Sequence, residues 1–204
     1  MTQTQSLPQL MTFAEFLEWK PENGRYELHR GKSVEMQPTG KHEEISGFLA
    51  VEFAVLFRNN NLSYFLPKQA WVKVPTENSG YLPDLLVVDK DAIADEPLWN
   101  KSSTLTKGTS IPLVVEIVSS NWRDDYLTQL RDYEEIGINE YWIVDHLGLG
   151  GSRYIGSPKR PTISIYRLVD REYQVQYFRN DESVRSPTFP ELDLTADQIF
   201  RGGR

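Results

Sequence analysis

The decapeptide IPLVVEIVSS, residues 111–120, decides how the rest of the chain is interpreted. Apolar side chains occupy both alternating faces of this stretch, which is typical of a strand buried on both sides in a helix-covered sheet. Glu116 stands in the middle of the apolar run. Because an uncompensated buried carboxylate costs several kcal/mol, comparable to the stability of a domain, we expect Glu116 to have a partner. A buried ion pair with an arginine and a bound metal ion are the two alternatives.

The size and composition of the chain indicate a globular protein with one sizeable core. The chain has 204 residues, of which 39% are hydrophobic and 25% charged. We expect a flexible arm at residues 1–11 and a single domain at residues 12–204. The apolar runs are too short to span a membrane, and residues 1–10 lack the basic start and apolar core of a signal peptide. The absence of cysteine excludes disulfides and thiolate metal sites, so a cytoplasmic protein is the simplest interpretation.

The charge balance argues against a surface that binds nucleic acid everywhere. Twenty-two Lys and Arg residues against 29 Asp and Glu residues give a net charge of −7. Non-specific affinity for DNA comes mainly from neutralised phosphates, so a nucleic-acid role needs a local basic patch or metal ions.

Hydrophobic periodicity and turn residues, followed outward from residues 111–120, predict a mixed sheet with helices on it. Thr12 with Glu15, and Thr195 with Gln198, form capping boxes that begin two short helices. Residues 91–110 are polar, rich in turn formers, and expected to form a surface connection. The other expected elements are helices at 41–59 and 121–137, strands at 64–74, 81–89, 111–120 and 139–145, and hairpins at 25–36 and 162–178.

A second carboxylate stands at the start of the apolar strand that precedes Glu116. Asp84 follows Pro83 and precedes the run LLVV. Two carboxylates that approach from neighbouring strands repel each other unless a cation lies between them. Such oxygen-rich sites suit Mg²⁺ or Mn²⁺, which keep several waters and can activate one for attack on a phosphodiester. The alternative for Asp84 alone is a strand-entry turn after proline.

Several segments in order along the chain resemble one known family. RYELHRGKSVEM, a helix beginning near KHEEISGFLA, LPD, VVEIVS and the segment DDYLTQLRDYEEIGINEYWIVD are similar to the Uma-type putative restriction endonucleases, a domain of unknown function. The resemblance covers about residues 12–200. It implies an α/β (α+β) fold of the PD-(D/E)XK superfamily: a restriction endonuclease-like core with a mixed central β-sheet flanked by helices, and additional N-terminal and C-terminal β-hairpins.

The resemblance also implies roles for particular residues. Asp84 and Glu116 match the two acids that bind the divalent metal in that superfamily. The lysine that usually follows two positions after the acid is Val118 here. Related sequences often carry this lysine on the next helix, where this chain has Gln129. Glutamine can hydrogen-bond a water but cannot take its proton at neutral pH, so we expect weak or absent nuclease activity.

Two more residues are candidates for the catalytic site. Glu27 occupies the glutamate position of the YEL pattern, and its alternative is an exposed strand acid. His42 stands at the start of the second helix, where the superfamily often places a polar group facing the site. The alternative for His42 is an exposed histidine near a helix N-terminus.

The leading hypothesis is therefore a divalent-metal-dependent endonuclease that hydrolyses DNA phosphodiester bonds, weakened by glutamine at the lysine position. The alternative is a catalytically inactive nuclease-fold protein that acts in nucleic-acid binding or assembly. DNA is the expected partner, and a homodimer is expected by analogy with nucleases whose subunits each cut one strand.

Overall fold

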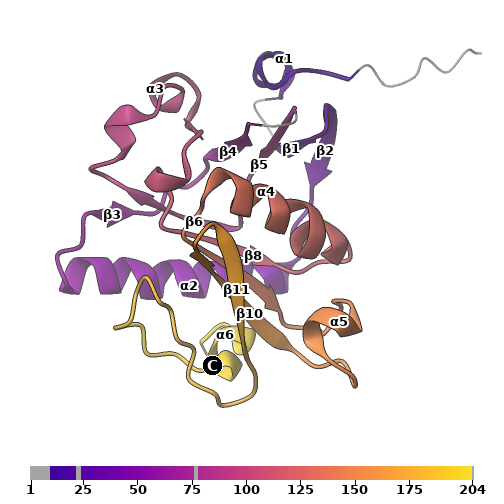
Figure 1. Cartoon of the computed structure of the whole chain (residues 1–204), viewed down its shortest axis with the longest axis vertical. Coiled ribbons are helices and arrows are strands. Elements are labelled where there is room, and N and C mark those ends of the chain that lie inside the picture. Colours follow the sequence, from indigo (N-terminus) through magenta and orange to yellow (C-terminus); the bar gives the residue numbers. More distant parts are fainter. Residues whose placement is uncertain (1–9, 22–23, 76–77, 204) are drawn as a thin grey trace, which may run out of the picture.

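The computed structural model describes residues 10–21, 24–75 and 78–203. Figure 1 shows two β-sheets joined in one body, with helices on their outer faces. Most of the N-terminal arm predicted at residues 1–11 lies outside the described residues. Among the described residues, no helix is both long enough and apolar enough to cross a membrane.

The larger sheet has six strands and contains the stretch on which the sequence analysis began. Its spatial order is β11-β10-β9-β8-β6-β3, and only the β8–β9 pair in it is parallel. All five residues of β8 are buried, as expected for a strand covered on both faces. The strands are β3 (Tyr64–Phe65), β6 (Leu85–Asp89), β8 (Leu113–Ile117), β9 (Glu140–Asp145), β10 (Thr162–Val169) and β11 (Glu172–Phe178).

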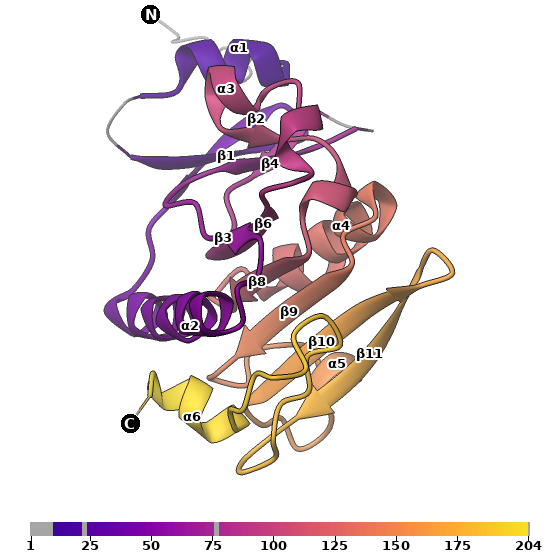
Figure 2. The same cartoon turned by 90° about the vertical axis from the view of Figure 1, so that its left-hand side faces the viewer.

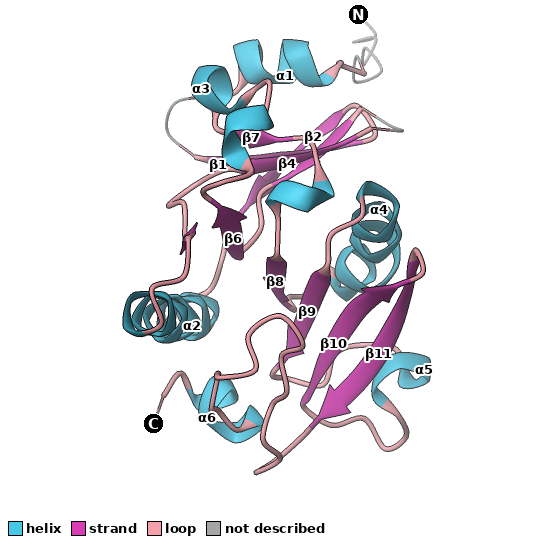
Figure 3. Ribbon diagram, turned by 60° about the vertical axis from the view of Figure 1, so that its left-hand side comes forward, coloured by secondary structure: helices cyan, strands magenta, loops and turns pink. Residues whose placement is uncertain are grey.

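Helices cover the six-stranded sheet on both faces. The long helix α2 (Gly40–Asn59) and the short α6 (Ala196–Arg201) pack on one face, where Phe53 meets Trp142. A π-helical turn, η3 (Asp124–Gln129), and α4 (Leu130–Ile136) pack on the other face. Figures 2 and 3 show α2 and α4 on opposite sides of this sheet. Glu116 therefore lies in a strand enclosed between two helical layers.

The second sheet has five strands in the order β2-β1-β5-β4-β7. Helix α1 (Phe13–Trp19) packs on it through Phe13 and Phe16, at the end of the molecule opposite α6 (Figure 2). The strands are β1 (Arg25–His29), β2 (Lys32–Met36), β4 (Trp71–Val74), β5 (Ser79–Tyr81) and β7 (Thr104–Leu105).

Three boundary predictions were wrong, each at a place where the chain changes sheet or where the helix type changes. The predicted strand 64–74 is divided into β3 and β4, and the predicted strand 81–89 into β5 and β6, because the chain crosses between the sheets in both places. The predicted helix 121–137 begins with η3 rather than a regular α-helix.

Residues 91–110 are more than a surface connection. They form η1 (Ile93–Asp95), α3 (Trp99–Ser102), β7 and η2 (Gly108–Ser110). Strand β7 pairs in parallel with β4, and both of its residues are buried. Just before β7, the carbonyl of Ser103 accepts a hydrogen bond from Trp71 N–H at 3.0 Å. The polar composition of the segment concealed this two-residue strand.

Both capping boxes and both hairpins are confirmed. Thr12 and Thr195 each accept a hydrogen bond from the backbone N–H three residues later, and the side chains of Glu15 and Gln198 return the contact. The hairpin turns are at Arg30–Gly31 and Asp170–Arg171, all of which have positive φ. One further short helix, α5 (Ser152–Ile155), follows β9.

Candidate active site

Asp84 lies where the chain crosses from the five-stranded to the six-stranded sheet, between β5 and β6. Its Oδ2 accepts a hydrogen bond from Ile117 N–H at 2.8 Å and lies 2.9 Å from Nε2 of His42. Its Oδ1 lies 3.7 Å from a terminal nitrogen of Arg25. The side chain is nine-tenths buried, so these contacts fix its orientation. This position is thus more than a strand-entry turn.

Glu116 lies opposite Asp84 on the neighbouring strand. The β6–β8 register pairs Leu85 with Val115, which places the preceding and following residues side by side. Glu116 Oε2 accepts from Asp84 N–H at 3.3 Å, while Glu116 Oε1 accepts from the Tyr133 hydroxyl at 2.9 Å. Asp84 N–H donates to the Glu116 carboxylate, and Ile117 N–H, next to Glu116, donates to the Asp84 carboxylate. Hydrogen bonds therefore connect the two acids in both directions.

The electrostatics of this pair favour a cation. Burial raises the pKa of Glu116 well above its usual value, and the charges of Asp84, Glu27 and Asp125 raise it further. The Tyr133 hydrogen bond lowers the pKa but does not cancel these effects. A carboxylate in this place needs either a proton or a positive partner.

Glu27 is an interior residue, so the exposed alternative is wrong. It is only 1% exposed and bridges two elements. Its Oε1 accepts from Leu82 N–H at 2.7 Å, and its Oε2 lies 2.6 Å from Nε2 of His29. Glu27 thus holds the crossing segment just before Asp84.

His42 is likewise buried rather than exposed at the helix surface. It lies in the first turn of α2, whose N-cap is Thr39. Burial lowers the pKa of His42, but the hydrogen bond and charge of Asp84 outweigh burial, so its pKa is raised. The Nδ1 atom of His42 has no hydrogen-bond partner among the described residues.

Gln129 is buried, as the helical spacing predicted, but it is not hydrogen-bonded to the two acids. It ends η3 and is 3% exposed, and its Oε1 lacks a partner within the described part of the chain. Gln129 lies one helical turn before Tyr133, whose hydroxyl reaches Glu116. A π-helical turn at this point is notable because such turns recur at functional sites.

Asp125 and Arg25 belong to the site and were missed from the sequence. Burial raises the pKa of Asp125 well above its usual value, and the charges of Asp84 and Glu27 raise it further. Its spacing of four residues before Gln129 could have revealed it. Arg25 gave no comparable signal, because it precedes the recognised YEL pattern and meets Asp84 only through the fold.

The donor set fits a metal ion that keeps most of its water. No group of three or more His, Asp or Glu side chains in the described ranges is arranged to enclose a metal. Asp84 and Glu116 nevertheless offer carboxylate oxygens at one spot, with the raised pKa of Glu116 marking an unmet need for positive charge. Mg²⁺ is commonly held by one or two carboxylates and several waters, and Mn²⁺ shares its preference for oxygen ligands, so both ions suit this pair.

Comparison with known proteins agrees with the fold. Two mixed sheets flanked by helices, with acids meeting where the chain crosses between them, define a restriction endonuclease-like nuclease fold. The chain belongs to the Uma2 family, described as putative restriction endonucleases, whose model matches residues 13–197.

A solved structure shares the fold over nearly its whole length. A crystal structure of a putative nuclease belonging to DUF820 from Anabaena variabilis ATCC 29413 superposes with a TM-score of 0.71 at 18% sequence identity. The match covers 95% of this chain and 99% of that one. No curated protein matches the chain.

Proposed function

We propose that this protein is a divalent-metal-dependent endonuclease that hydrolyses DNA phosphodiester bonds. The observation that carries the proposal is the Asp84–Glu116 pair, in which Glu116 accepts from Asp84 N–H and has a strongly raised pKa. Such a pair is the minimal ligand set for Mg²⁺ or Mn²⁺. Membership of the putative restriction endonuclease family supports DNA as the substrate.

Each residue of the site has a distinct role in this proposal. Asp84 and Glu116 hold the metal, which when bound supplies charge neutralisation and a water of lowered pKa. His42 fixes one oxygen of Asp84, and Glu27 fixes the backbone two residues before it. Gln129 can orient a water through its amide but cannot accept a proton, so the reaction is slow.

The second candidate function is nucleic-acid binding or assembly without cleavage. The observation that favours it is Gln129, because a neutral side chain occupies the position where related sequences carry lysine. The two functions differ in turnover and agree in metal binding.

The test compares Asp84→Asn and Glu116→Gln with Glu140→Gln. Glu140 is an equally buried acid whose carboxylate is bound by Ser186 and Thr188, away from the acid pair. Calorimetry measures Mn²⁺ binding. Cleavage is measured separately on supercoiled, linear and single-stranded DNA. We expect both site variants to lose metal binding and cleavage while Glu140→Gln keeps them. Cleavage that survives both site substitutions would refute the assignment, whereas metal and DNA binding without cleavage by the unmodified chain selects the second function.

We further propose that residues 12–204 act as one domain that pairs with a second copy, so that each copy cuts one DNA strand. Light scattering of the free protein and of its DNA complex measures the mass directly. A monomeric mass in both states would contradict the pairing.

A further inference from the structure

Two cavities lie on either side of Asp84, and they share only two lining residues. One has a volume of about 400 Å³ and the other about 580 Å³. Asp84 and Arg25 line both cavities. A polymeric ligand that entered both cavities would therefore pass the candidate metal site at Asp84.

The smaller cavity combines apolar residues with a larger number of polar and charged ones, a mixture that suits the faces and the edge of a heterocycle. It is formed by β2, the start of α2 and the segments that follow β8 and β9. Its apolar residues are Val34, Met36, Pro38, Val118, Leu147 and Leu149. Its polar residues include Ser119, Ser120 and Asn121 after β8, and the two histidines His42 and His146.

Both histidines of this cavity leave a ring nitrogen unused. Nδ1 of His42 and Nδ1 of His146 are buried without a hydrogen-bond partner among the described residues. Buried polar atoms are nearly always paired, so two unpaired ring nitrogens on residues of one cavity suit a ligand with hydrogen-bonding groups at its edge. Burial lowers the pKa of His146, so its ring is neutral and offers one donor and one acceptor.

The larger cavity is more polar, and its Lys68 forms no ion pair with the described residues. Lys68 and Gln69 line it, together with Glu43, which lies 3.5 Å from Arg25. Lysine and arginine are the usual contacts for phosphate oxygens. The two cavities thus differ in chemistry: one suits an uncharged heterocycle and the other an anionic backbone.

We propose that the smaller cavity is a nucleobase subsite, which takes one unstacked base of a nucleic-acid strand whose adjoining phosphate lies at Asp84 and Arg25. The inference rests on the proposed function and specifies its substrate. A base cannot enter such a cavity from within a paired duplex, so the favoured substrate is a single strand or a duplex with an unpaired nucleotide. The ring nitrogens of His42 and His146 hydrogen-bond the edge of the base.

The probe for this subsite is an oligonucleotide that carries one 2-aminopurine, whose fluorescence increases when the base leaves its stack. None of the residues that line the cavity is Trp, Tyr or Phe, so an inserted base stays unstacked and fluorescent. Titration in Ca²⁺, which permits binding but does not support turnover, should increase the fluorescence. A matched oligonucleotide fully paired in a duplex should bind more weakly, with no increase.

Two variants make the test specific to the cavity. Ser120→Leu narrows the cavity from its exposed rim without adding an aromatic ring, and we expect it to weaken single-strand affinity about tenfold and to abolish the fluorescence increase. Ser152→Leu is the matched control, since Ser152 is also exposed but does not line the cavity. His146→Leu should reduce the fluorescence increase without changing Mn²⁺ affinity.

The outcomes distinguish the subsite from the nuclease. A protein that binds Mn²⁺ and cleaves DNA, but gives no fluorescence increase or binds equally well after Ser120→Leu, lacks the subsite and keeps the proposed function. A protein that shows the increase but cleaves nothing keeps the subsite and loses the proposed function. Failure to bind any single strand overturns the subsite outright.

Discussion

At the scale of the residue, Glu116 shows how a buried acid is tolerated. Two donors, Tyr133 and the backbone of Asp84, satisfy its oxygens, yet the pKa of Glu116 stays high because three other acids surround it. Replacing these acids with apolar residues would relieve this repulsion, as is often found for buried charges. The acid cluster therefore costs stability.

Gln129→Lys tests whether the missing cation limits the reaction. The side chain at this position is buried one turn from Tyr133, so a lysine placed there would lie beside the acid cluster. We expect single-turnover cleavage to rise about 100-fold, the usual size of an acid–base contribution. Gln129→Met is the neutral control of similar length and should leave cleavage at the level of the unmodified chain. An equally slow Gln129→Lys enzyme would show that lysine at this position is not the missing group.

The His29–Glu27 pair gives stability a defined pH dependence. Burial lowers the pKa of His29, but the hydrogen bond and charge of Glu27 outweigh burial and raise it above 6.5. Because the folded-state pKa is the higher one, the stabilisation is complete below pH 6.5 and is lost as the pH rises through the folded-state value. We expect His29→Gln to reduce the free energy of unfolding more at about pH 6 than at about pH 9, measured by urea titration.

The control for this pH dependence is His146→Gln. Burial lowers the pKa of His146 below 6.5, so its stabilisation is present above pH 6.5 and is lost as the pH falls. The two variants should therefore show opposite trends. Parallel trends would contradict the roles of burial and of Glu27.

The sequence identified the residue types of the site better than their contacts. Asp84, Glu116 and His42 were named from sequence and meet directly in the fold. Glu27 reaches the site only through Leu82 N–H, and Gln129 is buried nearby without a hydrogen bond to the acids. The contact of Arg25 with Asp84 depends on the crossing between sheets, which no local pattern encodes. The catalytic roles of these residues are proposals.

At the scale of the element, glycine at helix ends makes a prediction with an internal control. Gly137 ends α4 in the left-handed region with φ 84°, and a Cβ added there would meet nothing within 4 Å. The cost of Gly137→Ala is therefore backbone strain alone, about 1 kcal/mol. Gly47 lies inside α2 with the same open space, so Gly47→Ala should stabilise by up to about 1 kcal/mol. Urea unfolding measures the change in the free energy of unfolding for both variants, and changes of the same sign would contradict the explanation.

Element types were predictable where periodicity is strong and failed where tertiary structure overrides it. Helix α2, strand β8 and both hairpins follow from apolar spacing and turn residues. The division of 81–89 into β5 and β6 did not, because apolar residues continue through Leu82 while the chain changes sheets. The π-helical turn at 124–129 was not predicted, because helical spacing does not distinguish a π-helical turn from a regular α-helical one.

At the scale of the whole molecule, an acidic protein needs local positive charge where it meets DNA. The net charge of −7 repels a polyanion at long range. Around Asp84, however, Arg25 and Lys68 line one cavity together with Glu43 and Asp84, so a divalent cation held at Asp84 would make the charge of this cavity positive. Binding to DNA is therefore expected to be local, metal-assisted and sensitive to salt.

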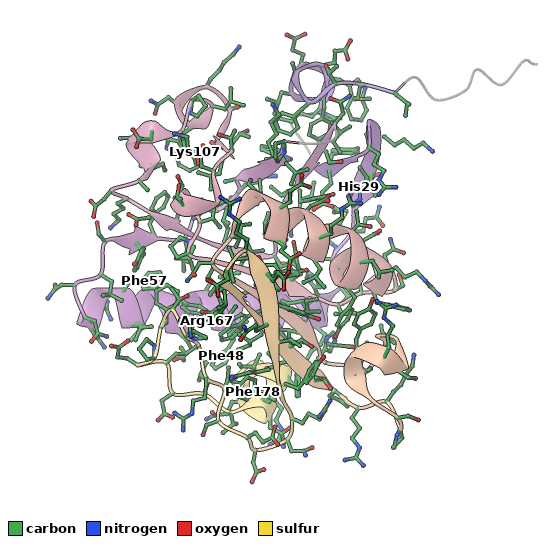
Figure 4. All side chains as sticks on the ribbon, viewed as in Figure 1. His29, Phe48, Phe57, Lys107, Arg167 and Phe178 are labelled. Atoms are coloured by element: carbon green, nitrogen blue, oxygen red, sulfur yellow. The ribbon has the colours of Figure 1, made fainter. Side chains whose placement is uncertain are left out.

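Lys68→Ala measures this local contribution. If Lys68 neutralises one phosphate, the logarithmic dependence of affinity on salt concentration should weaken by about one unit, and the affinity itself should fall. Lys107→Ala is the matched control, because Lys107, which is labelled in Figure 4, is also an exposed lysine but does not line the Lys68 cavity. Fluorescence anisotropy with one oligonucleotide, between about 50 and about 200 mM salt, gives both slopes. Equal salt dependences of affinity for the two variants would show that the bound DNA strand does not pass through the Lys68 cavity.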